Sequence, residues 1–241
     1  MRHLFLILLL QSATLSALAQ TEVLPPVRTE LKRDGSALPY ARINTLLSKM
    51  KRYGEGVYRM DFKVDTKKTQ LALADIRLAV ASDDADYPIP IGAEGGFDLP
   101  ILPEAEAKTA DLATNVPKGK LAVRGSIELN MKPEELTLAK VRQALRVAHT
   151  LREELLPFYL RWLFPRVEAV RICSATPTWE LEWRENGQLM GLTLPRAVGE
   201  RDPETKKGEA GRPCTLLNGQ ENWPEAARLV PPADTKLSIK F

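Results

Sequence analysis

The apolar pattern of the chain begins with an uninterrupted run over residues 4–10, preceded by Arg2 and followed by a looser apolar stretch. A charged start and a short apolar core are typical of a secretory signal peptide. Ala17 and Ala19 supply the small residues that a signal peptidase requires, so we expect a signal peptide over residues 1–19 and cleavage before Gln20. The alternative, an uncleaved membrane anchor, needs about 20 predominantly apolar residues, and this run is too short.

The next pattern is an extended leader followed by a helix. Residues 20–40 contain several prolines and a glycine among mixed charges, which predicts little structure of their own. Over residues 41–53 the apolar side chains recur every three or four positions and stop at Gly54. That spacing predicts a short amphipathic helix.

From Val57 the period changes to two, which is typical of strands with one buried face. Apolar residues alternate over residues 57–64, over 72–80 and again over 120–131, and shorter apolar pieces between them are bounded by Pro or Gly. Five short strands separated by turn signals predict an antiparallel sheet or a small sandwich.

A long helix is expected after Lys132. Pro133 and the two glutamates that follow suit a first helical turn, and apolar residues then continue at helical spacing to Leu155. Pro157 should bend or end this helix. The following segment is rich in aromatic residues: Phe158, Tyr159, Trp162 and Phe164.

The clearest local signal is Asn186-Gly187, the preferred pair for a two-residue type I′ hairpin turn. That turn sets one register, whose apolar face we expect to lie in a core. The expected pairs are Trp183 with Met190, Leu181 with Leu192, and Trp179 with Leu194. Further strands are expected over residues 167–173 and 237–241.

These patterns together predict an α+β fold: mainly antiparallel β-sheet or sandwich, one long amphipathic helix, a short N-terminal helix and a C-terminal β-hairpin. We divide the chain into the signal peptide (1–19), the leader (20–40), a β-rich region (41–132) and a helix plus β-hairpin region (133–241). The last two regions could be separate domains or parts of one domain.

Composition adds a disulfide to this picture. The sequence has two cysteines, Cys173 and Cys214, and an even count in an exported chain predicts one bond. Closing that loop would stabilise the fold by about 4 kcal/mol in the chain-entropy model and would tether the polar loop 196–213. A reactive thiol pair is the alternative, but the C-x-x-C spacing of redox enzymes is missing.

The charge balance is close to neutral, with a formal net charge of +3, so nucleic acid is not an expected partner. The distribution is less even, since residues 75–111 are mainly acidic and residues 140–171 mainly basic. We interpret these segments as two solvated faces that attract each other across a contact. The alternative is an anion-binding surface.

Candidate chemistry is sparse. His149 and Glu153 are one helical turn apart, so a general-base pair is possible, although a surface ion pair is the ordinary explanation. After removal of the signal peptide no second histidine is left to complete a zinc site, so we expect neither a metal nor a cofactor. The acidic turn at residues 83–86 lacks the pattern of a calcium loop.

Tryptophan is the other candidate, because its ring can stack on sugars. Trp162 and Trp223 are flanked by polar residues or proline and are the candidate binding aromatics, together with Arg161.

The leading hypothesis is therefore a soluble, periplasmic or secreted protein that is not an enzyme and does not span the membrane. It would act as a binding or envelope-accessory protein whose partner is another protein or an envelope component. The alternatives are a cofactor-free secreted hydrolase that uses His149 and a glycan-binding module.

Overall fold

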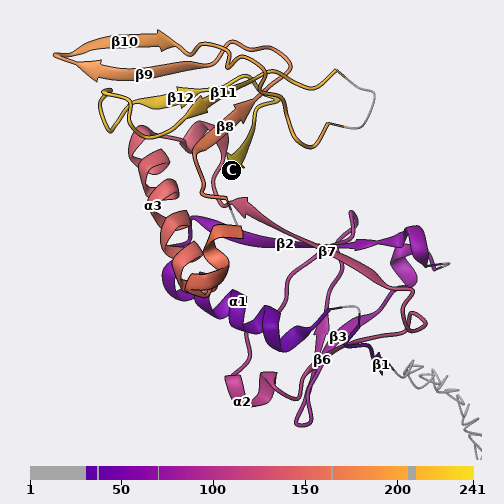
Figure 1. Cartoon of the computed structure of the whole chain (residues 1–241). Coiled ribbons are helices and arrows are strands. Elements are labelled where there is room, and N and C mark those ends of the chain that lie inside the picture. The colour runs from indigo at the N-terminus through magenta and orange to yellow at the C-terminus, as the bar shows by residue number, and fades with distance from the viewer. Residues whose placement is uncertain (1–30, 37, 70, 164, 206–209) are drawn as a thin grey trace, which may run out of the picture. The chain divides into compact units, whose positions relative to one another are not determined.

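The computed structural model describes residues 31–36, 38–69, 71–163, 165–205 and 210–241 (Figure 1). Residues 31–241 cluster as one compact unit. The predicted signal peptide and cleavage site, and residues 20–30 of the predicted leader, lie outside the described residues. None of the described helices combines the length and the apolar character needed to cross a bilayer.

The mixture of helices and antiparallel strands confirms the α+β class. The α-helices are α1 (Tyr40–Tyr53), α2 (Glu104–Ala107) and α3 (Leu138–Leu155). Short 3₁₀ segments punctuate the chain at η1 (Thr66–Lys68), η2 (Leu73–Asp75), η3 (Pro133–Glu135) and η4 (Phe158–Leu163).

Two antiparallel sheets form in the first half of the described chain. One has the order β1-β6-β3-β4 and the other the order β5-β2-β7. Strands β2 and β7 pair along their full length, from Tyr58 opposite Leu129 to Asp65 opposite Ala122. The bounds are β1 (Lys32–Arg33), β2 (Tyr58–Asp65), β3 (Leu78–Ala81), β4 (Asp86–Ile89), β5 (Gly96–Phe97), β6 (Asp111–Thr114) and β7 (Ala122–Leu129).

The strand expected over residues 72–80 is wrong at its beginning. Residues 73–75 form η2, and only Leu78–Ala81 is strand. The Asn115 side chain accepts a hydrogen bond from the Arg77 main-chain N–H and donates one to the Asp75 carbonyl, which satisfies that backbone without a strand partner. All four residues of β3 are buried, so the expected alternation of buried and exposed faces does not hold there either.

The long helix starts later than expected. Its first residue is Leu138, and Thr137 caps it by accepting a hydrogen bond from the Lys140 main-chain N–H. Leu136 stays extended because its side chain is buried and its carbonyl accepts a hydrogen bond from the main chain of Leu229, 2.8 Å away. The end at Leu155, just before Pro157, agrees with the prediction.

Two further antiparallel sheets, β10-β9-β12 and β11-β8-β13, contain the remaining strands. The predicted hairpin register is confirmed, and Asn186 and Gly187 both have positive φ, 49° and 80°. Its apolar face is buried only at the base, at Trp179, Leu181 and Leu194, whereas Met190 near the turn is exposed. The bounds are β8 (Ala169–Cys173), β9 (Glu180–Glu185), β10 (Gln188–Thr193), β11 (Cys214–Leu217), β12 (Arg228–Val230) and β13 (Lys236–Lys240).

Two hydrophobic cores organise these elements. Phe62 and Leu112 are central to the first, and the buried face of α3 packs with Ile172 and Trp179 in the second. Strands β2 and β7 contribute to both cores, because Tyr58 and Leu129 at one end belong to the second core. These two strands therefore connect the packing of the two halves.

Candidate functional site

An apolar groove of about 510 Å³ lies between helices α1 and α3 and is the strongest candidate site. Tyr58 of β2, residues of β7 and β13, and Leu156, Pro165 and Val167 complete its walls. The lining residues are Arg42, Thr45, Leu46, Lys49, Tyr58, Ile127, Ala148, Leu151, Arg152, Leu155, Leu156, Pro165, Val167, Ile239 and Phe241.

The two helices line the groove with the same spacing. Helix α1 contributes residues 42, 45, 46 and 49, and α3 contributes residues 148, 151, 152 and 155. Positions i, i+3, i+4 and i+7 share one face of a helix, so each helix presents a single continuous stripe to the groove. Each stripe mixes aliphatic and cationic residues, which is why periodicity alone did not separate these positions from ordinary core and surface residues.

Tyr58, which lines the groove, connects strand β2 to helix α3. Its ring is buried, and its hydroxyl donates a hydrogen bond to the carbonyl of Ala144, 2.8 Å away. Burial raises the pKa of Tyr58 above its ordinary range, so this hydroxyl stays protonated and keeps donating.

Part of the apolar lining faces water. Ile127 on β7 is 51% exposed and Phe241 is 64% exposed, although both line the groove together with the partly buried Leu46 of α1 and the buried Leu151 of α3. Exposed apolar groups in a concave surface lose contact with water when a ligand fills it, which stabilises the complex.

Among the described residues that line the groove, every charged side chain is a cation: Arg42, Lys49 and Arg152. Lys49 donates to the main-chain carbonyl of Glu154. A carbonyl oxygen carries no formal charge, so this bond positions the Lys49 ammonium without neutralising it. The groove thus combines an apolar interior with cationic side chains, an arrangement that suits a ligand with an apolar chain and an anionic group.

A second cavity, of about 480 Å³, lies beside η1 and β2. Its lining is more polar, and two of its charges, Asp65 and Arg124, already form an ion pair with each other. A hydrogen bond from the main chain of Lys67 is the largest cause that holds the pKa of Asp65 below its usual range, and the pairing with Arg124 is the next. We therefore regard this cavity as the weaker candidate.

The structure places His149 and Glu153 together on an exposed face of α3. The His149 Nε2 and Glu153 Oε1 atoms are 3.4 Å apart, and about half of each side chain is exposed. Neither residue lines either of the two cavities described above. The pair has the geometry of the surface ion pair that the sequence suggested as the ordinary explanation.

The candidate binding aromatics differ from each other. Trp162 is 78% exposed, whereas Trp223 is partly buried and packs against the second core. Arg161 donates to the carbonyls of Leu156 and Glu153, at 3.1 and 2.7 Å, and so satisfies the C-terminal end of α3.

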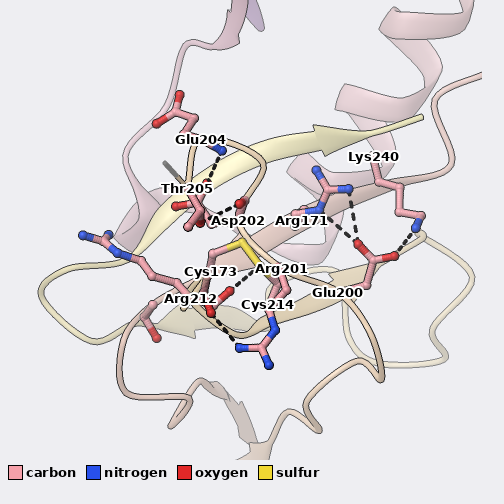
Figure 2. The surroundings of a disulfide bond; sticks show 12 residues. Arg171, Cys173, Glu200, Arg201, Asp202, Glu204, Thr205, Arg212, Cys214 and Lys240 are labelled. Carbon is pink, nitrogen blue, oxygen red and sulfur yellow. Dashed lines mark hydrogen bonds and ion pairs between the residues drawn. A yellow bond between two sulfur atoms is a disulfide. The ribbon is translucent and has the colours of Figure 1, made fainter. Parts of the chain in front are cut away.

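The predicted disulfide between Cys173 and Cys214 is present, and both cysteines are buried (Figure 2). They are direct partners in the pairing of β8 with β11. Figure 2 also shows Glu200, from the loop after β10, between Arg171 and Lys240. The hydrogen bond from Lys240 is the main reason why the pKa of Glu200 is lowered. The disulfide and Glu200 thus attach this loop to the sheet.

Three arginines of the basic segment form described ion pairs, and none of these pairs reaches the acidic segment. Arg146 pairs with Glu55, Arg142 with Glu225 and Arg171 with Glu200, and these glutamates lie outside residues 75–111. Within the acidic segment Asp83 pairs with Arg33. Among the described residues no group of three or more potential metal ligands comes together.

No protein-family model matches the chain, and the searches of curated proteins and of solved structures found no match either.

Proposed function

We propose that this protein is a non-enzymatic binding protein of the cell envelope, and that it holds an anionic amphiphile in the groove between α1 and α3. The observation that carries the proposal is an apolar lining whose described residues include three cations and no acidic side chain. The apolar chain of the ligand would lie against residues such as Leu46, Leu151 and Ile127. Its anionic group would lie near Arg42 or Lys49.

The size of the groove supports this ligand class. Its volume of about 510 Å³ falls within the roughly 300–1,000 Å³ that is usual for small-molecule sites. An extended fatty acid is apolar along its chain and carries a carboxylate at one end. It therefore matches both the aliphatic and the cationic residues of the lining.

The hydroxyl groups in the lining support binding over catalysis. Thr45 donates to the carbonyl of Ala41 and Tyr58 donates to the carbonyl of Ala144. A hydroxyl that donates to a carbonyl is not activated by a general base, so neither geometry is that of a nucleophile. We also propose that the protein is exported, with cleavage after Ala19, since the disulfide is compatible with an oxidising compartment.

Calorimetric titration tests the proposal. We expect palmitate, below its critical micelle concentration, to bind one site and to bind more tightly than the uncharged hexadecanol. Ile127→Glu places a carboxylate in the groove and removes apolar contact, so it should weaken palmitate binding by at least about tenfold. Arg42→Gln should weaken the binding of palmitate more than that of hexadecanol.

Leu189→Glu is the matched control, because Leu189 is an exposed strand residue that does not line the groove. It should leave palmitate binding unchanged. His149→Ala should also leave it unchanged, and no His149-dependent hydrolysis of a palmitoyl ester should be detected. The proposal would be contradicted if neither palmitate nor hexadecanol bound. It would also be contradicted if the Ile127→Glu and Leu189→Glu variants lost the same amount of palmitate affinity.

A further inference from the structure

The η4 segment presents four large apolar side chains to solvent. Phe158 is 80% exposed, Tyr159 59%, Trp162 78% and Leu163 54%. These residues are consecutive or nearly so in one 3₁₀ segment. A concentration of exposed aromatic residues of this kind usually marks an interaction surface.

Hydrogen bonds hold the backbone of this segment in place. Leu160 donates from its main chain to the Pro157 carbonyl, 2.9 Å away. Arg161 donates to the end of α3, and Arg152 donates back to the Arg161 carbonyl. The rings of Phe158 and Tyr159 pack edge to face, with centroids 5.4 Å apart. The aromatic residues are therefore displayed by an anchored turn.

The chemistry of the segment fits the interfacial zone of a lipid bilayer. Tryptophan and tyrosine are enriched at that depth because their rings are apolar and carry one polar group. Over residues 157–166 the charged residues are Arg161 and Arg166, with no acidic residue among them. Cations beside inserted apolar side chains are attracted to anionic lipid headgroups.

We propose that the η4 segment docks this protein on the surface of an anionic lipid bilayer. The segment lies between Leu156 and Pro165, which both line the groove, so docking brings the groove close to lipid. This inference goes beyond the proposed function and is tested separately, because vesicle binding does not require an occupied groove.

Vesicle flotation tests the docking. The full-length mature protein should float with vesicles made of equal parts phosphatidylcholine and phosphatidylglycerol, and should float less with phosphatidylcholine alone. Trp162→Glu should reduce partitioning by at least about tenfold, because a charge replaces an inserted ring. Arg166→Gln should reduce it by about fivefold, and added salt should weaken binding of the unmodified protein.

Tryptophan fluorescence assigns the contact to this segment. On addition of the anionic vesicles the emission should shift to shorter wavelength, and Trp162→Phe should remove that shift while flotation persists, since phenylalanine keeps an apolar ring. Val198→Glu is the matched control, because Val198 is fully exposed and lies in a different loop. It should float like the unmodified protein.

Several results would overturn the inference. Equal flotation of the Trp162→Glu and unmodified proteins would remove the segment from the contact. Equal binding to neutral and anionic vesicles would exclude anionic lipid as the recognised surface. If the unmodified protein did not float but formed a dimer, and the Trp162→Glu variant were a monomer, the same residues would form a contact between two copies of the chain. Each result is independent of palmitate binding in the groove.

Discussion

The Glu55 side chain connects two parts of the fold that are far apart in the sequence. It lies between α1 and β2 with a positive φ of 49°, a conformation that is uncommon for a residue with a side chain. Its carboxylate accepts hydrogen bonds from both terminal nitrogens of Arg146, at 2.7 and 2.9 Å, and from the Gln143 amide at 2.9 Å. These bonds connect the turn to helix α3.

The Arg146 and Gln143 bonds lower the pKa of Glu55 from 4.5 to about 2. A carboxylate whose pKa is lower in the folded protein contributes its stability above its unfolded pKa and loses it as the pH falls toward the folded value. We therefore predict that the Glu55→Gln variant loses less stability than the unmodified protein between pH 4.5 and about 2. Urea unfolding at a series of pH values measures the difference.

Glu104→Gln is the control for that measurement, because the ion pair of Glu104 with Lys108 is largely exposed and solvent screens it. It should follow the unmodified protein across the same pH range. An Arg146→Gln variant should resemble Glu55→Gln. Parallel pH profiles for all four proteins would contradict a role for Glu55.

Whether the role of a residue could be predicted depends on how far along the sequence its interaction partners lie. The Asn186-Gly187 turn is predictable because both residues act on their own backbone. Glu55 is not, because Gln143 and Arg146 are 88 and 91 residues further along the chain. The cysteines are an intermediate case, since only two exist and a single pairing is possible.

At the scale of elements, the disulfide connects strands β8 and β11 through two cysteines that are 41 residues apart in the sequence. The intervening chain contains the β9-β10 hairpin and the loop that carries Glu200. Strand β8 is the centre of its sheet, with β11 on one side and β13 on the other. The bond therefore closes a long loop onto a central strand.

We predict that the double variant Cys173→Ala and Cys214→Ala loses about 4 kcal/mol of unfolding free energy, because its unfolded chain is no longer restricted by the closed loop. Urea unfolding monitored by circular dichroism measures the loss. Proteolysis should also cut the loop 196–213 of this variant sooner than that of the unmodified protein.

Reduction of the unmodified protein is the control and should give a similar loss of stability. Mass spectrometry of protein recovered after export should detect a chain that begins at Gln20 and has no free thiol. A chain that retains residues 1–19, or one with two free thiols, would contradict the proposed export. A double variant as stable as the oxidised protein would contradict the stabilising role of the bond.

Elements could be predicted where their own sequence decides the structure. The period of two located β2 and β7, and helical spacing located α1 and most of α3. The start of α3 could not be predicted, because the carbonyl of Leu136 is bonded to β12. The groove was missed for a related reason: its two helical stripes are visible in the sequence, but their facing arrangement depends on tertiary packing.

At the scale of the molecule, the described chain has two hydrophobic cores and two strands that contribute to both. Phe62 of β2 lies in the first core and Tyr58, on the same strand, lies in the second. Because β2 and β7 pair along their full length, loosening one core should disturb the strands that support the other. The sequence left open whether the two regions are separate domains, and this shared pair favours one cooperative unit.

Leu112→Ala tests that cooperativity. Leu112 is fully buried in the first core, so the substitution should cost about 2–5 kcal/mol of unfolding free energy. All four tryptophans, Trp162, Trp179, Trp183 and Trp223, belong to the second half of the chain. If the two halves unfold together, the transition followed by tryptophan fluorescence should move to lower urea by the same amount as the transition followed by circular dichroism.

Leu189→Ala, at an exposed position of β10, is the control and should leave both transitions in place. A tryptophan transition that stays fixed in the Leu112 variant, while circular dichroism resolves an earlier step, would show two independently folding units. Coincident movement would mean that each core is stable only while β2 and β7 remain paired. The groove between α1 and α3 would then depend on both halves, because Tyr58 and Ile127 on those two strands line it together with α3.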